Sequence, residues 1–442
     1  MVAQSLSRLV TASALLLSVA CVDVAVVASS SIAGASTVNC HARPHAGIDF
    51  AGCNLRGSNF NGVNLSHANL RRTNLNGSEL VRANLTGANL NGTHLSLTDL
   101  SDAHFTGADL SNVVSGSVIG VPLLPAKWKI IDGYLVGPRA NLSNAQFSGD
   151  DLSRADLFDV RLTGANLAGV TSGSITGSPI LPQGWKLVGG YLVGPGANLT
   201  GAALSGANMS LVKMQGANLT GANLTNANLP GANMSNAVLT GATLVGTRMN
   251  GSTLDGVTSG SIVGTPVLPT GWLLVNGYLV GNSANLKDAN FTNGNLFGAD
   301  LVSANLSGAA LTGVSSGSVQ GEFSATLPPN WSIKNGYLFG PGANLAGANL
   351  AGVGSILGDL QGANLSGANL SGVGWDAVTL IGVNMSNANL TGAQINGSAM
   401  TDVNLDGANL TNADFSGSDM STVTTNSLTI CPSGTLGPCV NL

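Results

Sequence analysis

The side chains that could catalyse a reaction or hold a metal ion are few and widely separated. His41 and His45 lie close to Cys40, a spacing that could accommodate a metal ion, but no second pair of ligands completes a tetrahedral site. His94 and His104 stand ten residues apart, each just before a large apolar residue. The Asp and Glu residues are scattered, so no carboxylate pair is expected for acid–base work. The sequence therefore predicts no catalytic residue, no metal site and no cofactor.

Aromatic residues form the second set that could have a chemical role. All four Tyr and four of the five Trp fall in related segments, where a Ser-Gly-Ser motif and a Pro-rich turn precede Trp and then Gly-Tyr. These residues are Trp128, Tyr134, Trp185, Tyr191, Trp272, Tyr278, Trp331 and Tyr337. Trp and Tyr are favoured at binding surfaces, so they could form a strip that contacts a glycan or a protein. We favour the alternative, in which they are structural plugs and any binding resides at loop tips near Lys186 and Asn276.

A period of five residues organises the elements that must position these side chains. From Leu199 to Leu254 a large apolar residue occupies every fifth position without a gap. The same register covers residues 50–110, 142–167, 286–311 and 345–420, with exceptions at Ser355 and Trp375. The period matches neither the alternation of a strand nor the 3.6-residue turn of a helix. The repeat predicts one continuous solenoid rather than several globular domains.

The repeated unit reads A-(N/D)-L-(S/T/N)-G. If the small residue and the Leu both point inward, the other three face solvent or turn a corner, and each unit forms one side of a narrow coil. A small partner is needed because a slender tube has no room for two large side chains. Asn and Gly tolerate the left-handed backbone of tight corners.

This unit resembles the pentapeptide-repeat family, and the resemblance covers most of the chain after residue 48. It implies an all-β fold, a right-handed quadrilateral β-helix in which four units make one coil. We expect the β-helix to span residues 49–430. On such a coil His94 and His104 face opposite sides and cannot share a metal ion.

Four inserts interrupt the repeat, near residues 113–140, 170–197, 257–284 and 314–343, and are named the first to fourth inserts in chain order. Each contains W-x-(L/I)-x-x-G-Y-L or a close variant, which predicts two short strands around a tight turn. Candidate turn pairs are Asp132-Gly133, Asn276-Gly277 and Asn335-Gly336. We expect each insert to continue the coil with one strand and to add a hairpin that protrudes or folds back.

Residues 1–35 have the features of an export signal. Arg8 precedes the apolar run 9–28, and Ala33-Gly34-Ala35 is a small-x-small cleavage site before Ser36. Asp23 and the serines at 29–31 disfavour a membrane-spanning helix, and Ser18 disfavours a lipoprotein signal at Cys21. We expect a secreted or cell-envelope protein with no membrane span once the signal is removed, although the signal could instead be retained as an anchor.

Four cysteines follow Ser36, two at each end of the solenoid. A disulfide requires Cα atoms within about 7 Å, so a solenoid between the two ends excludes cross-pairing. The expected pairs are Cys40–Cys53, next to an N-terminal cap over residues 36–48, and Cys431–Cys439, in a C-terminal disulfide loop over residues 431–442. The alternative for Cys53 is a simple core residue, because it occupies a small inward position.

The low content of charged residues disfavours two classes of function. Charged residues make up only 8% of the chain and the net charge is −5, which does not suggest nucleic-acid binding. The resemblance also raises the alternative of a DNA mimic that binds gyrase, but duplex DNA carries one charge per roughly 1.7 Å, so a mimic needs dozens of negative charges. We favour an exported, non-catalytic structural or interaction solenoid whose partner is a protein or an envelope glycan. The sequence specifies neither the ligand nor the oligomeric state.

Overall fold

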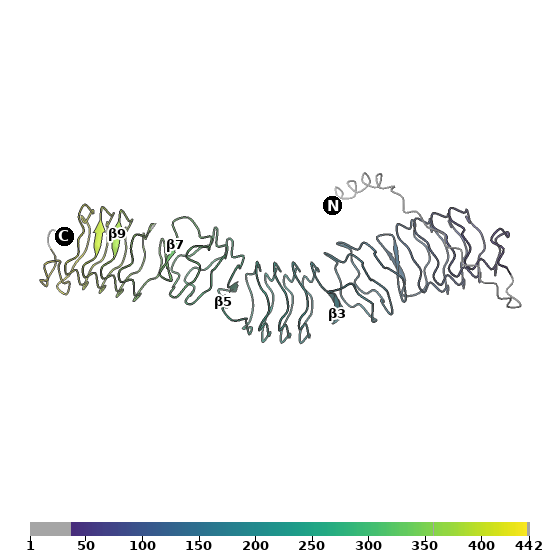
Figure 1. Ribbon diagram of the computed structural model, residues 1–442, viewed down its shortest axis with the longest axis horizontal. Helices are drawn as coiled ribbons and strands as arrows, with labels where there is room; N and C mark the ends of the chain where they lie inside the picture. Colours follow the sequence, from purple (N-terminus) through teal and green to yellow (C-terminus); the bar gives the residue numbers. More distant parts are fainter. Residues whose placement is uncertain (1–36, 357, 440–442) are drawn as a thin grey trace, which may run out of the picture. The chain divides into compact units, whose positions relative to one another are not determined.

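The computed structural model describes residues 37–356 and 358–439. The predicted export signal and its cleavage site lie outside the described residues. From Cys40 onward the chain forms one compact unit built from successive coils of backbone (Figure 1). Within the described ranges, no helix has the length and apolar character needed to span a bilayer.

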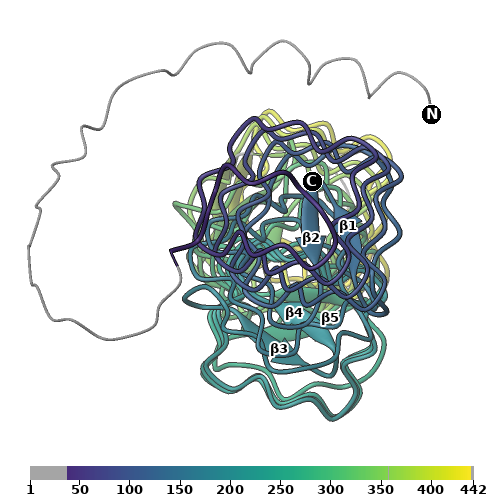
Figure 2. The ribbon, with the colours of Figure 1, turned by 90° about the vertical axis from the view of Figure 1, so that its right-hand side faces the viewer.

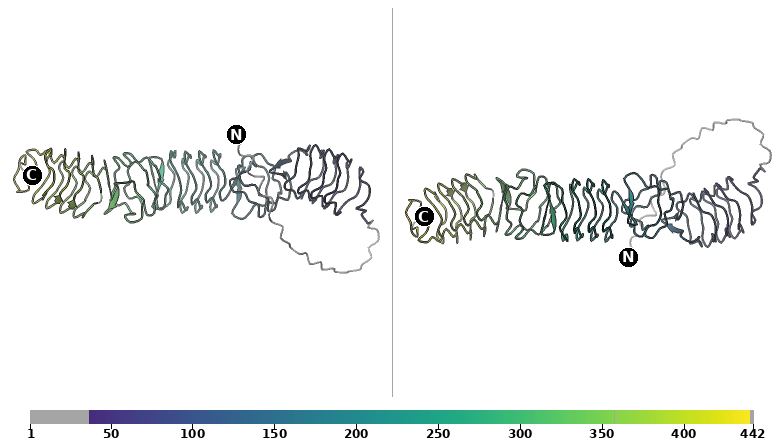
Figure 3. Two further views of the ribbon diagram at one scale, coloured as in Figure 1. Left: turned by 90° about the horizontal axis from the view of Figure 1, so that it is seen from above. Right: turned by 90° about the horizontal axis from the view of Figure 1, so that it is seen from below.

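Each coil contains four five-residue units. The outward residue of a unit pairs in parallel with the residue 20 positions later, as Asn64 does with Asn84, and Asn84 in turn with His104. The amide of Leu65 donates to the carbonyl of Asn84 (2.7 Å), and the amide of Asn84 donates to the carbonyl of Val63 (2.9 Å). Figure 3 shows the coils following one another in views from two opposite directions. The predicted coil of four units is confirmed.

The local chemistry of one unit explains its residue types. Leu65 and Ala68 are fully buried, and the carbonyl of Leu65 accepts a hydrogen bond from the Ala68 amide across the corner (3.1 Å). The side chain of Asn64 accepts one from the Ser66 amide (3.1 Å). His67, the second corner residue, has a φ of 59°, in the left-handed region that Gly or Asn adopts most easily. Asn before Leu and Gly at the second corner position therefore both stabilise the turn.

Polar residues replace Ala at several small inward positions without being left unpaired. The buried Thr73 hydroxyl donates to the carbonyl of Phe50 in the preceding coil (2.8 Å), and Thr247 does the same to Leu224 (2.7 Å). A buried hydroxyl is tolerated when it is hydrogen-bonded. The inward position therefore requires a small side chain, and it tolerates a polar one if that side chain is hydrogen-bonded.

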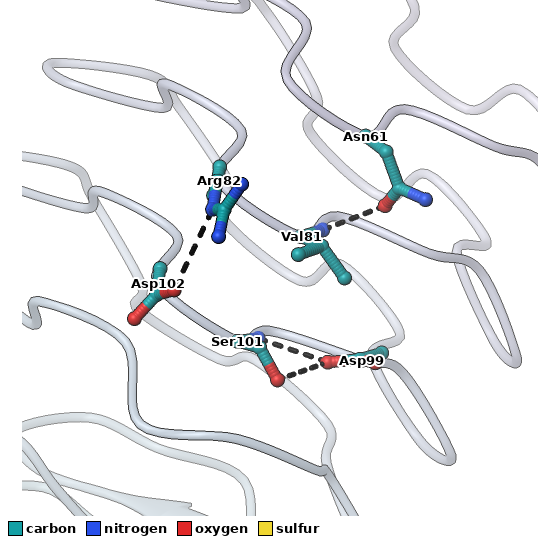
Figure 4. A network of polar contacts seen from close by, with 6 residues as sticks. All are labelled: Asn61, Val81, Arg82, Asp99, Ser101 and Asp102. Atoms are coloured by element: carbon teal, nitrogen blue, oxygen red, sulfur yellow. Dashed lines mark hydrogen bonds and ion pairs between the residues drawn. The ribbon is translucent and has the colours of Figure 1, made fainter.

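Exposed polar side chains tie corners and sides together (Figure 4). The carboxylate of Asp99 accepts hydrogen bonds from the amide and the hydroxyl of Ser101 (2.9 and 2.6 Å). Arg82 and Asp102, at corners of adjacent coils, form an ion pair of 3.7 Å. Both partners of that ion pair are largely exposed, so it adds little to stability.

The extended strands are three residues long and fall mainly in the inserts. They are β1 (Lys129–Ile131), β2 (Tyr134–Val136), β3 (Lys186–Val188), β4 (Tyr191–Val193), β5 (Leu273–Val275), β6 (Tyr278–Val280), β7 (Ser332–Lys334), β8 (Tyr337–Phe339), β9 (Gly374–Asp376) and β10 (Gln394–Asn396). The first eight form one antiparallel hairpin per insert, whereas β9 and β10 pair in parallel on adjacent coils. At the first hairpin turn, Asp132 and Gly133 have φ values of 43° and 73°, as a type I′ turn requires.

The two exceptions to the large central residue differ in burial. Ser355 and Trp375 occupy the same side of consecutive coils, and the Gly374 amide donates to the Val353 carbonyl (3.3 Å) as at regular positions. Ser355 is exposed, whereas Trp375 is fully buried with its ring 6.2 Å from the Phe339 ring. Trp375 and Ile356, the residue after Ser355, both belong to the core cluster of these coils, so the interior contains large side chains at both.

Candidate functional site

Each insert hairpin lies inside its coil rather than protruding from it. Leu135 and Val136 are adjacent on β2 and both fully buried, but Leu135 belongs to the core cluster before the hairpin and Val136 to the cluster after it. Neighbouring side chains on a strand point in opposite directions, so the hairpin crosses the coil and separates two core clusters. Figure 2 labels β1 and β2 in a view turned by 90° from that of Figure 1. The same alternation recurs at Leu192 and Val193, Leu279 and Val280, and Leu338 and Phe339.

The Ser-Gly-Ser motif anchors the hairpin to the coil wall. The buried Ser115 hydroxyl oxygen accepts a hydrogen bond from the Leu135 amide (2.8 Å), and the carbonyl of Gly133 at the turn accepts one from Val118 (3.0 Å). Ser172, Ser259 and Ser316 accept the equivalent bonds in the other inserts. Sequence reasoning identified the motif but not this role, and its recurrence before the Trp of each insert was the available signal.

The Trp residues fill core space that the coil wall leaves empty. Gly137 occupies a central position, where regular units have Leu, and a Cβ atom added to it would lie 2.3 Å from the Trp128 ring. The indole therefore occupies the place of the missing large side chain. Trp185, Trp272 and Trp331 cover Gly194, Gly281 and Gly340 in the same way. This geometry agrees with the interpretation of the Trp residues as plugs.

The Tyr residues are half-buried and close the other end of each hairpin. The ring of Tyr134 lies against Gly116, and its hydroxyl oxygen accepts a hydrogen bond from the Gln146 amide in the next coil (3.1 Å). Tyr191 and Tyr337 accept equivalent bonds from Ala203 and Asn349. Tyr278 packs its ring 5.2 Å from that of Phe291. The Tyr side chains thus link each insert to the following coil.

The four hairpins do not share one side of the solenoid. The first begins in the column of Leu157, because the Arg139 amide donates to the carbonyl of Phe158. The second lies in the column of Leu167, because the Gly169 amide donates to the carbonyl of Gly196. Leu157 and Leu167 are two units apart, so these columns are on opposite sides of a four-sided coil. The eight aromatic residues are therefore not brought together into a continuous strip.

Lys186 and Asn276, predicted near hairpin tips, are both exposed, but only Asn276 lies at a turn, because Lys186 begins β3 and the turn of its hairpin is Gly189–Gly190. The Lys186 ammonium donates to the carbonyl of Ser210 (3.2 Å). The Asn276 side-chain amide donates to the carbonyls of Asn290 and Thr292 (3.3 and 3.2 Å). These hydrogen bonds hold the two side chains against the next coil and leave part of each at the surface.

Sequence reasoning missed Phe297, an aromatic side chain that is 63% exposed beside the third and fourth inserts. Its ring forms a wall of two clefts, of about 400 and 260 Å³. The larger is lined by Leu273, Leu274, Val275, Asn276, Asn295 and Phe297. The smaller is lined by Phe297, Ser315, Ser316, Tyr337 and residues 344–348. The signal in the sequence was a Phe at a corner position that usually holds Ser, Thr or Asn.

A third cleft, of about 510 Å³, lies at the first insert. It is lined by Gly120, Val121, Pro122, Leu124, Trp128, Lys129 and Ile130. Partial burial lowers the pKa of Lys129, while the nearby Asp151 carboxylate opposes that shift. The Lys129 ammonium donates to the carbonyl of Ser153 (2.7 Å), so it is held against the wall.

The carboxyl groups with shifted pKa values are explained by the turn motif. Hydrogen bonds from Ser153 hold the pKa of Asp151 below its usual range, and Ser416 and Ser421 do the same for Asp414 and Asp419. Each Ser follows its Asp by two residues, as in the ordinary unit. The shifts therefore report local turns rather than an acid–base pair.

The histidines expected on opposite sides lie on separate ladders. His94 pairs with Asn74 and Val114, whereas His104 pairs with Asn84 and Leu123. Among the described residues, no three His, Cys, Asp or Glu side chains are placed to share a metal ion.

Disulfides join Cys40 to Cys53 and Cys431 to Cys439. Cys53 is also buried in the first core cluster, so its roles in the disulfide and in the core coexist. One covalent link therefore lies near each end of the described coils.

A comparison with known protein families finds one whose repeats match this chain. The model of the family described as pentapeptide repeats matches eight segments, which together cover more than half of the chain. They are residues 46–77, 78–114, 139–171, 195–229, 217–256, 282–315, 359–397 and 388–424. Proteins of this family are generally non-catalytic structural or interaction proteins. No curated protein matches the chain significantly.

Solved structures of pentapeptide repeat proteins resemble the chain at low identity. HetL, involved in heterocyst differentiation regulation in the cyanobacterium Nostoc, is 19% identical over 88% of this chain and 92% of its own, with a TM-score of 0.11. QnrB1, a plasmid-mediated fluoroquinolone resistance protein, is 17% identical over 48% of this chain and 94% of its own, with a TM-score of 0.16. A thylakoid-lumen protein of Arabidopsis thaliana is 27% identical over 35% and 66% of the two chains, with a TM-score of 0.07. Such scores carry no argument about function.

Proposed function

Because the chain belongs to the pentapeptide repeat family, we propose that it is an exported, non-catalytic interaction solenoid. The regular coils form the scaffold, and the outer surfaces of the inserts contact a protein or an envelope glycan. The net charge of −5 is too small for the DNA-mimicking alternative.

The observation that carries this proposal is the exposure of large apolar side chains on the inserts. Regular sides present mostly Asn, Thr and Asp, whereas the inserts expose aliphatic and aromatic groups. These groups are Ile119, Val121, Leu123, Ile180, Val263, Val267 and Phe323. Three of them, Ile119, Val121 and Leu123, lie within five residues of the first insert, and apolar side chains grouped in this way mark an interaction site more often than scattered ones do.

Export is supported by the two disulfides together with the apolar N-terminal segment. Disulfides persist in oxidising compartments and are rare in reducing ones. Sequencing the amino terminus of the natural product from the medium and the envelope tests this part. A start at Ser36 is expected, whereas a start at Met1 in the cytosol would contradict export and favour the DNA-mimicking alternative.

Binding is tested by sedimenting the mature chain with isolated cell-envelope material. Val121, which is 86% exposed in the first insert, and Phe323, 93% exposed in the fourth, are changed together to Ser. The control is Leu211→Ser, at an exposed corner outside the inserts. The proposal expects weaker sedimentation of the double variant and unchanged sedimentation of the control. Equal sedimentation of both would contradict a role for the insert surfaces.

A further inference from the structure

Phe297 differs from the residues at the same place beside the other inserts. It lies one coil before Gly317, the glycine of the fourth Ser-Gly-Ser motif, and a Cβ on Gly317 would lie 2.8 Å from its ring. The corresponding residues one coil before the other three motifs are Ser96, Ser153 and Thr240. A polar residue therefore suffices for the corner, and the exposed ring is not required by the fold.

The ring of Phe297 stands between two clefts with uncharged linings. The third insert supplies β5 and Asn276 on one side, and the fourth supplies Ser316 and Tyr337 on the other. None of the described residues that line either cleft is charged. Burying a charged group against such a surface without a partner is unfavourable, so a neutral ligand is favoured.

Hydrogen-bonding groups flank the ring on both sides. The Asn295 side-chain oxygen accepts from the Phe297 amide (3.0 Å), which directs its NH₂ group away from that bond. The Tyr337 hydroxyl oxygen accepts from the Asn349 amide (3.2 Å), so its own proton can be donated to a ligand. The Ser315 hydroxyl oxygen accepts from Asn344 (3.1 Å) and likewise keeps its proton. The site thus combines one exposed aromatic face with several donors.

We propose that Phe297, Asn295 and Tyr337 form a binding site for a neutral sugar ring of a glycan. The apolar face of a pyranose packs on an aromatic ring, and its hydroxyls accept and donate hydrogen bonds at the edge. The clefts on either side accommodate the neighbouring sugars of the same chain. This inference rests on the proposed interaction function and specifies the ligand class at one site. Because Ser96, Ser153 and Thr240 occupy the equivalent positions beside the other inserts, one such site per chain is expected.

The test is isothermal titration calorimetry of the mature protein with cellohexaose and chitohexaose as neutral probes. Hyaluronan provides the charged comparison. Phe297→Ser installs the residue type found at two equivalent positions, so folding should be retained. The matched control is Phe158→Ser, because Phe158 is also a corner Phe but is 45% exposed and covered by Arg139 at 5.6 Å. Melting curves of both variants verify that the coils remain intact.

We expect one bound neutral hexasaccharide per chain, at least a tenfold weaker affinity for Phe297→Ser, and no change for Phe158→Ser. Tyr337→Phe should weaken binding less, because it removes a donor and keeps the ring. Tenfold corresponds to about 1.4 kcal/mol. Neutral-sugar binding that is unaffected by Phe297→Ser would overturn this site but leave the interaction function standing. Binding of hyaluronan alone, or of no probe, would overturn the neutral-sugar assignment, whereas failure of the interaction function would appear separately in the envelope-sedimentation experiment.

Discussion

The regular coils and the insert coils fill the same narrow interior in different ways. In a regular coil each wall unit supplies its own large side chain, as Leu224 does, and a small residue beside it. In an insert coil the wall carries Ser115 and Gly137 at central positions, and the hairpin supplies Trp128 and Leu135 from within. The interior is therefore filled in both kinds of coil, by the wall in one and by the hairpin in the other.

The two kinds of coil also differ at their outer surfaces. Regular sides are ladders of Asn and related residues, in which one side chain bonds to the next, as Asn369 does to Asn349 (3.0 Å). The inserts lack this pattern and expose apolar groups such as Val121. Where an insert interrupts the repeat, the polar Asn ladder is lost from the outer surface. The same insert adds a hairpin to the core.

The largest effect is expected where a charge enters a regular coil. Leu224→Asp places a carboxyl group among stacked leucines and should reduce the free energy of unfolding by about 3–5 kcal/mol. Asn223→Asp, at the outward position beside it, should be nearly neutral. Thermal melts of the two variants provide the comparison, and equal losses would show that the inward and outward positions are assigned wrongly.

The next effect concerns the Trp plugs. Trp185→Ala and Trp272→Ala should each reduce the free energy of unfolding by about 3 kcal/mol, because each leaves a cavity beside a central glycine. Adding Gly194→Leu to Trp185→Ala restores a large wall side chain and should recover part of the loss. Unchanged stability of the Trp185→Ala and Trp272→Ala double variant, or no recovery with Gly194→Leu, would contradict the plug interpretation.

A smaller effect is expected at the third hairpin turn. Asn276 has a φ of 49° and donates to two carbonyls of the next coil, so Asn276→Ala should cost about 1–2 kcal/mol. Asn276→Gly keeps the backbone preference and loses only the side-chain bonds, as Gly189 does naturally at the second hairpin. Chemical denaturation measures both losses. If Asn276→Gly lowered the free energy of unfolding as much as Asn276→Ala, the backbone conformation at this turn would not contribute to stability.

The smallest effect is a pH dependence at the first insert. The folded-state pKa of Asp151 is lowered, chiefly by hydrogen bonds from Ser153, so its contribution is present above the usual carboxyl pKa and is lost as pH falls through the folded-state value. Asp151→Asn should therefore reduce stability near neutral pH by at most a few tenths of a kcal/mol, and the difference should vanish in acid. Chemical denaturation of both proteins at several pH values measures the difference in their free energies of unfolding. A difference that increased in acid would contradict the predicted direction of the pH dependence.

The regular coils could be predicted from the sequence because every unit repeats the same local chemistry. The period located the core, and Asn and Gly indicated the corners. The different burial of Ser355 and Trp375 could not be predicted, because it depends on how side chains such as Phe339 pack around them. The pairing of Asp132 with Gly133 indicated a hairpin, but only the burial of both Leu135 and Val136 shows that it crosses the coil.

The candidate site was less accessible to sequence reasoning. Trp and Tyr were noticed because they recur, and recurrence turned out to mark the residues that build the hairpins. Phe297 departs from the Ser, Thr or Asn that is usual at its corner, but the five-residue period continues through it, so the repeat did not mark it as a binding site. Its significance depends on the exposure of its ring and on the clefts that it forms with residues of the third and fourth inserts.

Amide hydrogen exchange tests most directly whether the insert hairpins lie inside the coils. The amides of Leu135, Leu192, Leu279 and Leu338 each donate to a Ser hydroxyl of the wall. Peptides covering them should exchange as slowly as those covering Leu224 in a regular coil, because both require the coil to open. Fast exchange of all four hairpins, with Leu224 still protected, would show that the inserts are surface loops and would contradict the account.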